Sequence, residues 1–307
     1  MIVTVIIFGI GLALLVKGAD AFVAGGSGLA IRHSISPAVI GFTIIAFGTS
    51  LPEFVVSVNA AASGNGAIAL GNVLGSNIAN IALVLALCTA IKPDMIAVTA
   101  EGRAGLLRHT GLMLVATAIF ALLAARGVFD AVAGAILLAT FAAVLIVLWR
   151  EQRQESAEAI ETHGRKDALL IVLGLAAVVI GSQLVITAAT DIAEAFGIPA
   201  FVIGMSMVAF GTSLPELATS LIAAVRNEGA ISTGNILGSN IFNLLLVLGA
   251  SAIASPIIVG SFTDVIVVVL FSAAVLPLIL APRRFIRPWS LLLLIGYVTY
   301  IAWLFSA

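Results

Sequence analysis

Long apolar segments alternate with short polar interruptions along the whole chain. A bilayer core about 30 Å thick needs about 20 apolar residues for one helical span. By this measure the pattern predicts ten spans, near residues 2–27, 37–62, 67–91, 105–124, 128–149, 168–194, 201–225, 230–254, 263–281 and 287–305. Apolar and polar residues do not alternate with a period of two, so the spans are expected to be helices rather than barrel strands. We therefore expect an all-α integral membrane protein.

The second half of the chain repeats the first. Residues 39–90 align with residues 202–253 without a gap, at a constant offset of 163, and about 28 of the 52 aligned positions are identical. Five predicted spans precede the polar segment 150–166 and five follow it. Because five is odd, the two copies must have opposite orientations in the membrane. The pattern predicts two inverted five-helix repeats, 1–149 and 167–307, joined by the linker 150–166, and transporters built this way bind substrate where the repeats meet.

The composition agrees with a membrane protein, since 62% of the residues are hydrophobic and 9% are charged, against roughly 45–50% and about 25% in soluble proteins. The first apolar segment lacks a preceding basic region, so it is expected to be a span and not a cleaved leader. The single Cys88 offers no disulfide and is expected in the core. His33, His109 and His163 lack metal-ligand spacing and are expected in surface loops.

The basic residues predict the orientation, because Lys and Arg concentrate on the cytoplasmic side of membranes. With an external N-terminus, twelve of the fourteen Lys and Arg residues fall in inner connections. Arg126 is then external, and Lys17 lies near the inner end of the first span. We expect a protein of the plasma or inner membrane with both termini external and the 150–166 linker cytoplasmic.

The octapeptide AFGTSLPE occurs twice, at 46–53 and at 209–216. Proline disfavours helical geometry in the preceding residue and leaves an upstream carbonyl without its donor. We therefore expect each span to break at this motif and to free backbone carbonyls near Ala46 and Ala209. Each copy also places an acid, Glu53 or Glu216, inside a span, where ionisable residues usually serve a function.

A second motif, GNxxGSN, follows in the next span of each repeat. Its serine lies four residues before an asparagine, so both side chains share one helical face. Such small polar residues often serve only helix packing. Beside two buried acids, however, they form a set of oxygen ligands of the kind that hard cations bind. The expected side-chain ligands are Glu53, Glu216, Thr49, Thr212, Ser50, Ser213, Ser76, Ser239, Asn80 and Asn243.

Two other acids lie in or near spans. The position that aligns with Asp20 is Gln183, so this acid is not duplicated. A packing or capping role near a helix end is expected for Asp20, and Asp191 is interpreted in the same way.

The paired motifs in two inverted repeats resemble the α-repeats of the sodium/calcium exchangers, within the cation/calcium antiporter superfamily. The resemblance implies ten transmembrane helices, four of which line a diamond-shaped set of cation sites. It also implies that Glu53 and Glu216 are the central ligands and that the carbonyls of Ala46 and Ala209 contribute. Some relatives have aspartate where this chain has Asn243. This difference weakens any carry-over of potassium dependence or proton coupling from those relatives.

Charge favours exchange over one-way transport. Two ionised glutamates carry a charge of −2, which one Ca²⁺ or two Na⁺ neutralise, whereas moving the empty site past an apolar barrier costs several kcal/mol per ion. We expect a Na⁺/Ca²⁺ antiporter that extrudes Ca²⁺ with the inward Na⁺ gradient, surrounded by lipid, with no cofactor and no nucleic-acid partner.

The sequence favours three other functions less than Na⁺/Ca²⁺ antiport. H⁺/Ca²⁺ exchange is a close alternative. A passive channel needs a continuous hydrated path and weak binding at several sites. An intramembrane hydrolase is least favoured, because the sequence has neither a recognisable nucleophile with its base nor a HExxH motif.

Overall fold

The computed structural model describes residues 2–96, 100–151, 166–196 and 211–304. Within these ranges eight helices are long and apolar enough to cross a membrane, and a bent helix pair makes a ninth. The predicted span 201–225 is described only from residue 211, so the count of ten stays a prediction. His163 and most of the predicted linker also lie outside the described residues.

Equivalent elements follow one another in the two repeats. The first contains α1 (Ile2–Arg32), α2 (Pro37–Ile40), η1 (Gly41–Ile45), α3 (Ala46–Thr49), α4 (Leu51–Ala62), α5 (Gly66–Ala79), η2 (Asn80–Leu85), α6 (Ala86–Ile91), η3 (Pro93–Met95), α7 (Ala100–Ala124), β1 (Val128–Phe129) and α8 (Ala131–Glu151). The second contains α9 (Asp167–Ala195), α11 (Leu214–Val225), α12 (Gly229–Ile241), η5 (Phe242–Val247), α13 (Leu248–Ala254), β2 (Ile257–Ile258), α14 (Phe262–Leu280) and α15 (Arg283–Leu304). The segments η1, η2 and η5 are π-helical, and η3 is a 3₁₀ turn.

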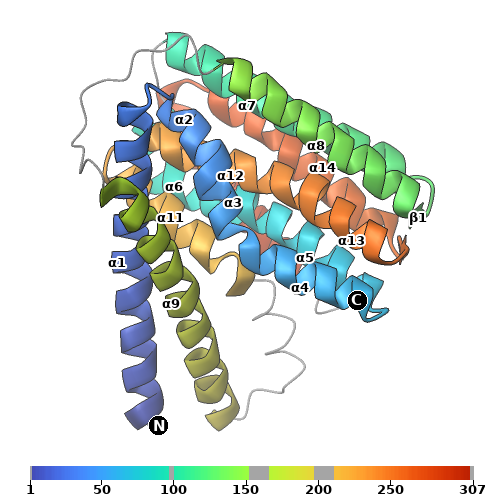
Figure 1. Cartoon of the computed structure of the whole chain (residues 1–307), viewed down its shortest axis with the longest axis horizontal. Coiled ribbons are helices and arrows are strands. Elements are labelled where there is room, and N and C mark those ends of the chain that lie inside the picture. Colours follow the sequence, from blue (N-terminus) through green and yellow to red (C-terminus); the bar gives the residue numbers. More distant parts are fainter. Residues whose placement is uncertain (1, 97–99, 152–165, 197–210, 305–307) are drawn as a thin grey trace.

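The helices α1 and α9 lie side by side in opposite directions and cross the remaining helices at a steep angle (Figure 1). Glycines make this close approach possible. A Cβ atom on Gly18 would lie 2.7 Å from the backbone nitrogen of Val178, and one on Gly181 would lie 2.5 Å from that of Leu15. Arg32 and the buried Asp167 pair at 3.4 Å between the two helices. Small residues at such contacts are the usual means of packing helices in lipid.

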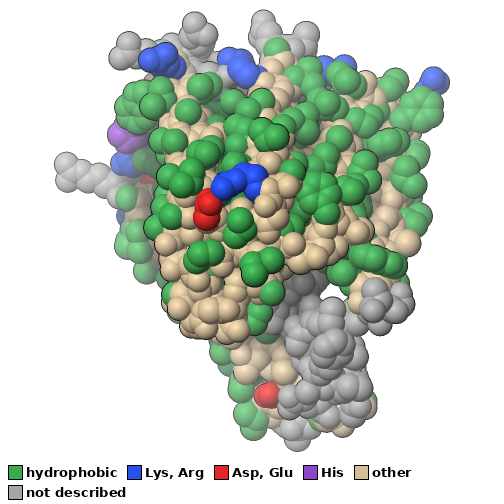
Figure 2. Space-filling model, turned by 90° about the vertical axis from the view of Figure 1, so that its right-hand side faces the viewer, with side chains coloured by type: hydrophobic (Ala, Val, Ile, Leu, Met, Phe, Trp, Pro, Cys, Tyr) green, Lys and Arg blue, Asp and Glu red, His purple; other side chains and the backbone are tan. Residues whose placement is uncertain are grey.

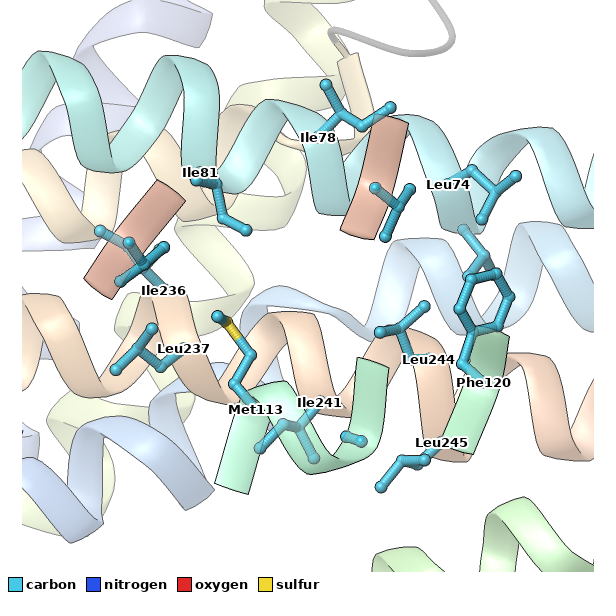
Figure 3. Packing of buried hydrophobic residues seen from close by; sticks show 14 of the residues in the cluster. Leu74, Ile78, Ile81, Met113, Phe120, Ile236, Leu237, Ile241, Leu244 and Leu245 are labelled. Atoms are coloured by element: carbon cyan, nitrogen blue, oxygen red, sulfur yellow. The ribbon is translucent and has the colours of Figure 1, made fainter. Parts of the chain in front are cut away.

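The core lies where the two repeats meet. In Figure 3, α5–η2 and α12–η5 run past one another in opposite directions, with apolar side chains between them. Met113 and Phe120 of α7 are fully buried against the same cluster. On another side of α12, Gly238 allows η1 to approach closely, because a Cβ atom there would lie 2.5 Å from the carbonyl oxygen of Phe42.

The outer surface is apolar. Large hydrophobic side chains such as Leu122 and Val172 are 73% and 63% exposed. Figure 2 shows hydrophobic side chains over much of one face, with most of the visible Lys and Arg side chains along the upper edge. This surface suits a chain whose helices face hydrocarbon.

Three details differ from the sequence predictions. His109 was expected in a loop, but it is buried in α7, where its ring lies 5.2 Å from that of Phe42. Residues 128–129 form the strand β1, which pairs with β2, so α8 begins at Ala131. Because α1 extends to Arg32, Asp20 lies inside a helix rather than near its end. The prediction that Cys88 is a buried core residue is confirmed.

Candidate cation site

Both copies of the octapeptide form the start of a half-helix. In the first repeat α3 ends at Thr49 and α4 begins at Leu51, with a bend of 48° between the two parts of the span. Ser50 has φ −86° and ψ 6°, and its equivalent Ser213 has φ −86° and ψ 2°. The predicted break is therefore confirmed in the first repeat, and the second repeat begins its half-helix with the same backbone geometry.

The two acids are fully buried, with 0% exposure, in the first turns of these half-helices. They are close enough to interact electrostatically. The hydroxyl of Ser50 donates to Oε1 of Glu216 at 3.1 Å. In the described part of the chain, both carboxylate oxygens of Glu53 and Oε2 of Glu216 have no hydrogen-bond partner. Buried carboxylates with so few donors are costly unless a cation compensates their charge.

Each acid lies near side chains of both repeats. Thr212 and Ser76 lie near Glu53, and Thr49, Ser50 and Ser239 lie near Glu216. The hydroxyls of Ser76 and Thr212 are 3.4 Å apart, and those of Thr49 and Ser239 are 3.5 Å apart. Residues of the two octapeptides and of the two GNxxGSN motifs therefore lie in one cluster. Both repeats contribute side chains to it.

Further unpartnered polar atoms come from the asparagines and serines that the motifs predicted. Asn80 and Asn243 are 1% and 0% exposed, and neither amide has a partner among the described residues. Asn80 begins the π segment η2, and Asn243 lies in η5. The hydroxyl of Ser213 is also buried without a partner in the described ranges. Amide and hydroxyl oxygens of this kind are neutral ligands for hard cations.

The carbonyl of Ala46 differs from its prediction. It was expected to be freed by the helix break, but it accepts the backbone N–H of Ser50 at 3.0 Å and lies 3.3 Å from the hydroxyl of Thr49. Ser50 still has a backbone N–H, and this donor completes the last helical turn before the break by bonding to Ala46. Ala209, the predicted equivalent of Ala46, lies outside the described residues.

Two asparagines of the site were missed from the sequence. Asn72 accepts a hydrogen bond from the hydroxyl of Thr212, and Asn235 accepts one from Thr49. Their signal was present, because both belong to the duplicated GNxxGSN motif and align at the offset of 163. Their partners are hydroxyls of the other repeat, which no spacing along the chain brings together.

The whole chain matches a known family. The family described as sodium/calcium exchanger protein matches residues 3–150 and 166–306. The chain belongs to the sodium/calcium exchanger family. It is therefore a transporter of the cation/Ca²⁺ antiport class and not an enzyme, and Na⁺ and Ca²⁺ are the ions associated with its family.

Individual members of the exchanger family are also similar. The chain is 36% identical to CaxA of Alkalimonas amylolytica, with both chains fully covered. It is 29% identical to the sodium/calcium exchanger MaX1 of Methanosarcina acetivorans, over 96% of this chain and 97% of the relative. The solved structure of the sodium-calcium exchanger NCX_Mj matches with a TM-score of 0.81 at 32% identity over 98% of each chain. The resemblance inferred from the motifs and the inverted-repeat fold are both confirmed.

Proposed function

We propose that this protein exchanges Na⁺ for Ca²⁺ by alternating access, with both ions bound in turn between Glu53 and Glu216. One observation carries the proposal: two fully buried carboxylates from opposite repeats lie in one cluster, and three of their four oxygens have no hydrogen-bond partner in the described residues. Intramembrane acids in this arrangement are expected to hold a transported cation. The names of MaX1 and NCX_Mj support sodium as the counter-ion.

The remaining proposed ligands are neutral oxygens around the two acids. Ca²⁺ takes six to eight oxygen ligands, and the cluster offers hydroxyl, amide and carbonyl groups in addition to carboxylates. The proposed set is Thr49, Ser50, Ser76 and Asn80 with the carbonyl of Ala46, and Thr212, Ser213, Ser239 and Asn243 with the carbonyl of Ala209. The Ala46 oxygen accepts the N–H of Ser50 with one lone pair, and its second lone pair is the one proposed to bind the cation.

The charge of the site supports coupled exchange. With both acids ionised the site carries −2, and one Ca²⁺ or two Na⁺ bring it to neutrality. The empty site would have to carry two uncompensated charges through an apolar layer, at a cost of several kcal/mol per ion. The carrier therefore changes its facing side readily only when it is loaded.

The distribution of basic residues supports the direction and location. We place the protein in the cell membrane with both termini external and the 150–166 linker cytoplasmic, because this arrangement puts twelve of fourteen Lys and Arg residues inside. In a cell with an inward Na⁺ gradient, exchange then removes Ca²⁺ from the cytoplasm. The topology is tested by labelling single cysteines in the linker and at the C-terminus on a Cys88→Ala background. Labelling of the linker from outside intact cells would reverse it.

Flux into proteoliposomes tests the function. Vesicles loaded with Na⁺ should take up Ca²⁺ when they are diluted into Na⁺-free buffer, and vesicles loaded with choline should not. A matched pair with a pH gradient and no Na⁺ provides the control. Uptake driven by the pH gradient alone would replace the proposal with H⁺/Ca²⁺ exchange, and uptake without any counter-ion would indicate a channel.

Equilibrium binding sharpens the choice of counter-ion. If Na⁺ and Ca²⁺ were bound at the same time, their positive charge would exceed the charge of −2 on the two ionised glutamates. The two ions should therefore compete for the site. Raising Na⁺ at constant ionic strength should lower the apparent Ca²⁺ affinity more steeply than one ion for one. Ca²⁺ affinity that ignores Na⁺ but falls at low pH would reject sodium coupling.

A further inference from the structure

Asn72 connects three parts of the site with one buried amide. Its nitrogen donates to the hydroxyl of Ser57 at 2.9 Å and to the carbonyl of Glu53 at 3.4 Å. Its oxygen accepts the hydroxyl of Thr212 at 3.3 Å, across the boundary between the repeats. Asn72 is only 5% exposed. Its amide nitrogen bonds to α4, and its amide oxygen accepts from the other repeat.

Asn235 does the same in the second repeat. Its nitrogen donates to the hydroxyl of Ser220 at 2.9 Å, and its oxygen accepts the hydroxyl of Thr49 at 3.1 Å. Ser220 is the equivalent of Ser57 at the offset of 163. The same bridge thus occurs twice, related by the inverted repeat, and each bridge ends on a threonine that lies beside the glutamate of the asparagine's own repeat.

The direction of a hydroxyl proton decides whether its oxygen can bind a cation. A threonine hydroxyl has one proton and two lone pairs, and a proton that points into the site repels a cation. An amide oxygen that accepts this proton turns the lone pairs toward the site. At Thr49 the choice also affects Ala46, because a proton given to Asn235 is no longer given to the carbonyl of Ala46, which lies 3.3 Å away.

We propose that Asn72 and Asn235 are positioning residues that hold the hydroxyl protons of Thr212 and Thr49 away from the site, so that both threonine oxygens present lone pairs to the transported cation. This inference rests on the proposed function. It requires no contact between either asparagine and the ion. Partners that orient a ligand in this way commonly change metal affinity by about 10–100-fold when they are removed.

A double-mutant cycle tests the proposal on the purified full-length protein. Ca²⁺ binding is measured in Na⁺-free buffer for the parent, Asn72→Ala, Thr212→Val and the double variant. We expect Asn72→Ala to weaken Ca²⁺ binding about 10-fold or more in the parent but less than about two-fold beside Thr212→Val, because the hydroxyl through which it acts is then absent. The mirrored cycle uses Asn235→Ala and Thr49→Val and should give the same coupling.

Controls separate positioning from general damage. Asn59→Ala changes an exposed asparagine of α4 and should leave binding unchanged. Equal losses of affinity for Asn72→Ala in both backgrounds, or no loss in the parent, would overturn the inference while the proposed function stands. A parent protein that binds no Ca²⁺ would overturn both together.

Discussion

The half-helices α4 and α11 carry the same motif, yet their surroundings differ. Ala218 and Ile222 of α11 pack against Leu15, Ala19 and Val178 of α1 and α9. The equivalent positions on α4 are Val55 and Asn59, and both are exposed, Val55 at 54%. Among the described residues α9 makes no contact with α4 comparable to that of α1 with α11. The two half-helices share their Leu-Pro-Glu start, but only 6 of their 12 aligned residues are identical, and Val55 and Asn59 stand where α11 has Ala218 and Ile222.

Hydrogen bonds and an ion pair also join α1 to the turn that follows α11, in addition to the apolar packing of α1 and α9 over α11. We call these polar contacts the tie and the apolar packing the cover. The turn after α11 contains Arg226 and Glu228. Arg226 donates to the carbonyl of Asp20 at 2.9 Å and pairs with its carboxylate at 3.4 Å, and Glu228 accepts a hydrogen bond from Ser27. Asp20 therefore joins α1 to this turn and does not serve the packing or capping role expected from the sequence.

The turn after α4 has the same backbone without these ties. Gly64 and Asn227 both have positive φ, 80° and 64°, at equivalent positions. The residues around Gly64 are Ser63 and Asn65, which are uncharged. The candidate ion site is therefore symmetric, whereas the packing of α1 and α9 around it is not. Under the proposed alternating-access function, the second state has the reverse packing, over α4 and away from α11.

The largest expected effect tests the symmetry of the site. Glu53→Gln and Glu216→Gln should each abolish Ca²⁺ flux in proteoliposomes, because glutamine keeps the size of the side chain but removes a charge that a dication needs. Asp191→Asn, an exposed acid on α9, should keep the flux. Wild-type flux in either glutamine variant would break the equivalence of the two repeats.

The next effect concerns the pair that covers α11. Gly18→Ala should lower the free energy of unfolding by about 1–3 kcal/mol, because the added Cβ meets the backbone of α9. Gly9→Ala is the matched control, since a Cβ there meets nothing within 4 Å. Thermal unfolding in detergent provides the measurement. Equal stability of the two variants would mean that α1 and α9 are not closely packed.

A smaller effect is expected at the tie between α1 and the turn after α11. Partly exposed ion pairs contribute up to about 1 kcal/mol, so Arg226→Gln should shift the balance of the two states by up to about five-fold. The probe is Thr219→Cys, a buried position on α11, labelled by an impermeant thiol reagent on a Cys88→Ala background. Labelling from the side of the turn should become faster. Arg126→Gln removes a local ion pair elsewhere and should not change the rate. A rate unaffected by Arg226→Gln would show that the tie does not hold the cover.

The smallest effect is a difference in pH dependence between two turns. Burial raises the pKa of Glu228 above its ordinary value of 4.5, although the Ser27 hydroxyl and Arg226 offset part of the rise. Hydrogen bonds from Arg126 and from the N–H of Ala133 lower the pKa of Asp130. The stability contributed by Glu228 is therefore full below 4.5 and is lost as pH rises through its raised pKa, and that of Asp130 is lost as pH falls through its lowered pKa.

Thermal unfolding of Glu228→Gln and Asp130→Asn from about pH 2 to about pH 8 checks these signs. The first variant should lose stability less than the parent as pH rises, and the second should lose it less as pH falls. Changes of the same sign in both variants would contradict the assignment.

Much of this arrangement was predictable from local rules. The break near Pro52, the burial of Cys88 and the duplication of Glu53 and Glu216 follow from proline geometry, from hydropathy and from the offset of 163. His109 was expected in a loop although it lies within the predicted span 105–124, and packing against Phe42 keeps its ring inside the helix. A contact between two rings that are far apart along the chain leaves no pattern in the local sequence from which it could be predicted.

Other features lay beyond the sequence for physical reasons. Asn72 finds Thr212 only after the two repeats cross, so no spacing along the chain reveals the bond. The unequal packing of α4 and α11 has only a partial signal in the sequence, where polar Asn59 stands in place of Ile222.

The π segments η2 and η5 have a mechanical consequence. A π turn is in effect one extra residue held in an α-helix, and one residue corresponds to about 1.5 Å of rise and about 100° of rotation. These segments lie at nearly equivalent places in the two repeats, contain the proposed ligands Asn80 and Asn243, and interrupt helices that are otherwise α-helical. If the extra residue migrates along its helix, one part of the helix can turn and shorten while the other stays in register. The π turns thus give both helices extra backbone length beside the proposed ligands, where the proposed site must bind and release a cation.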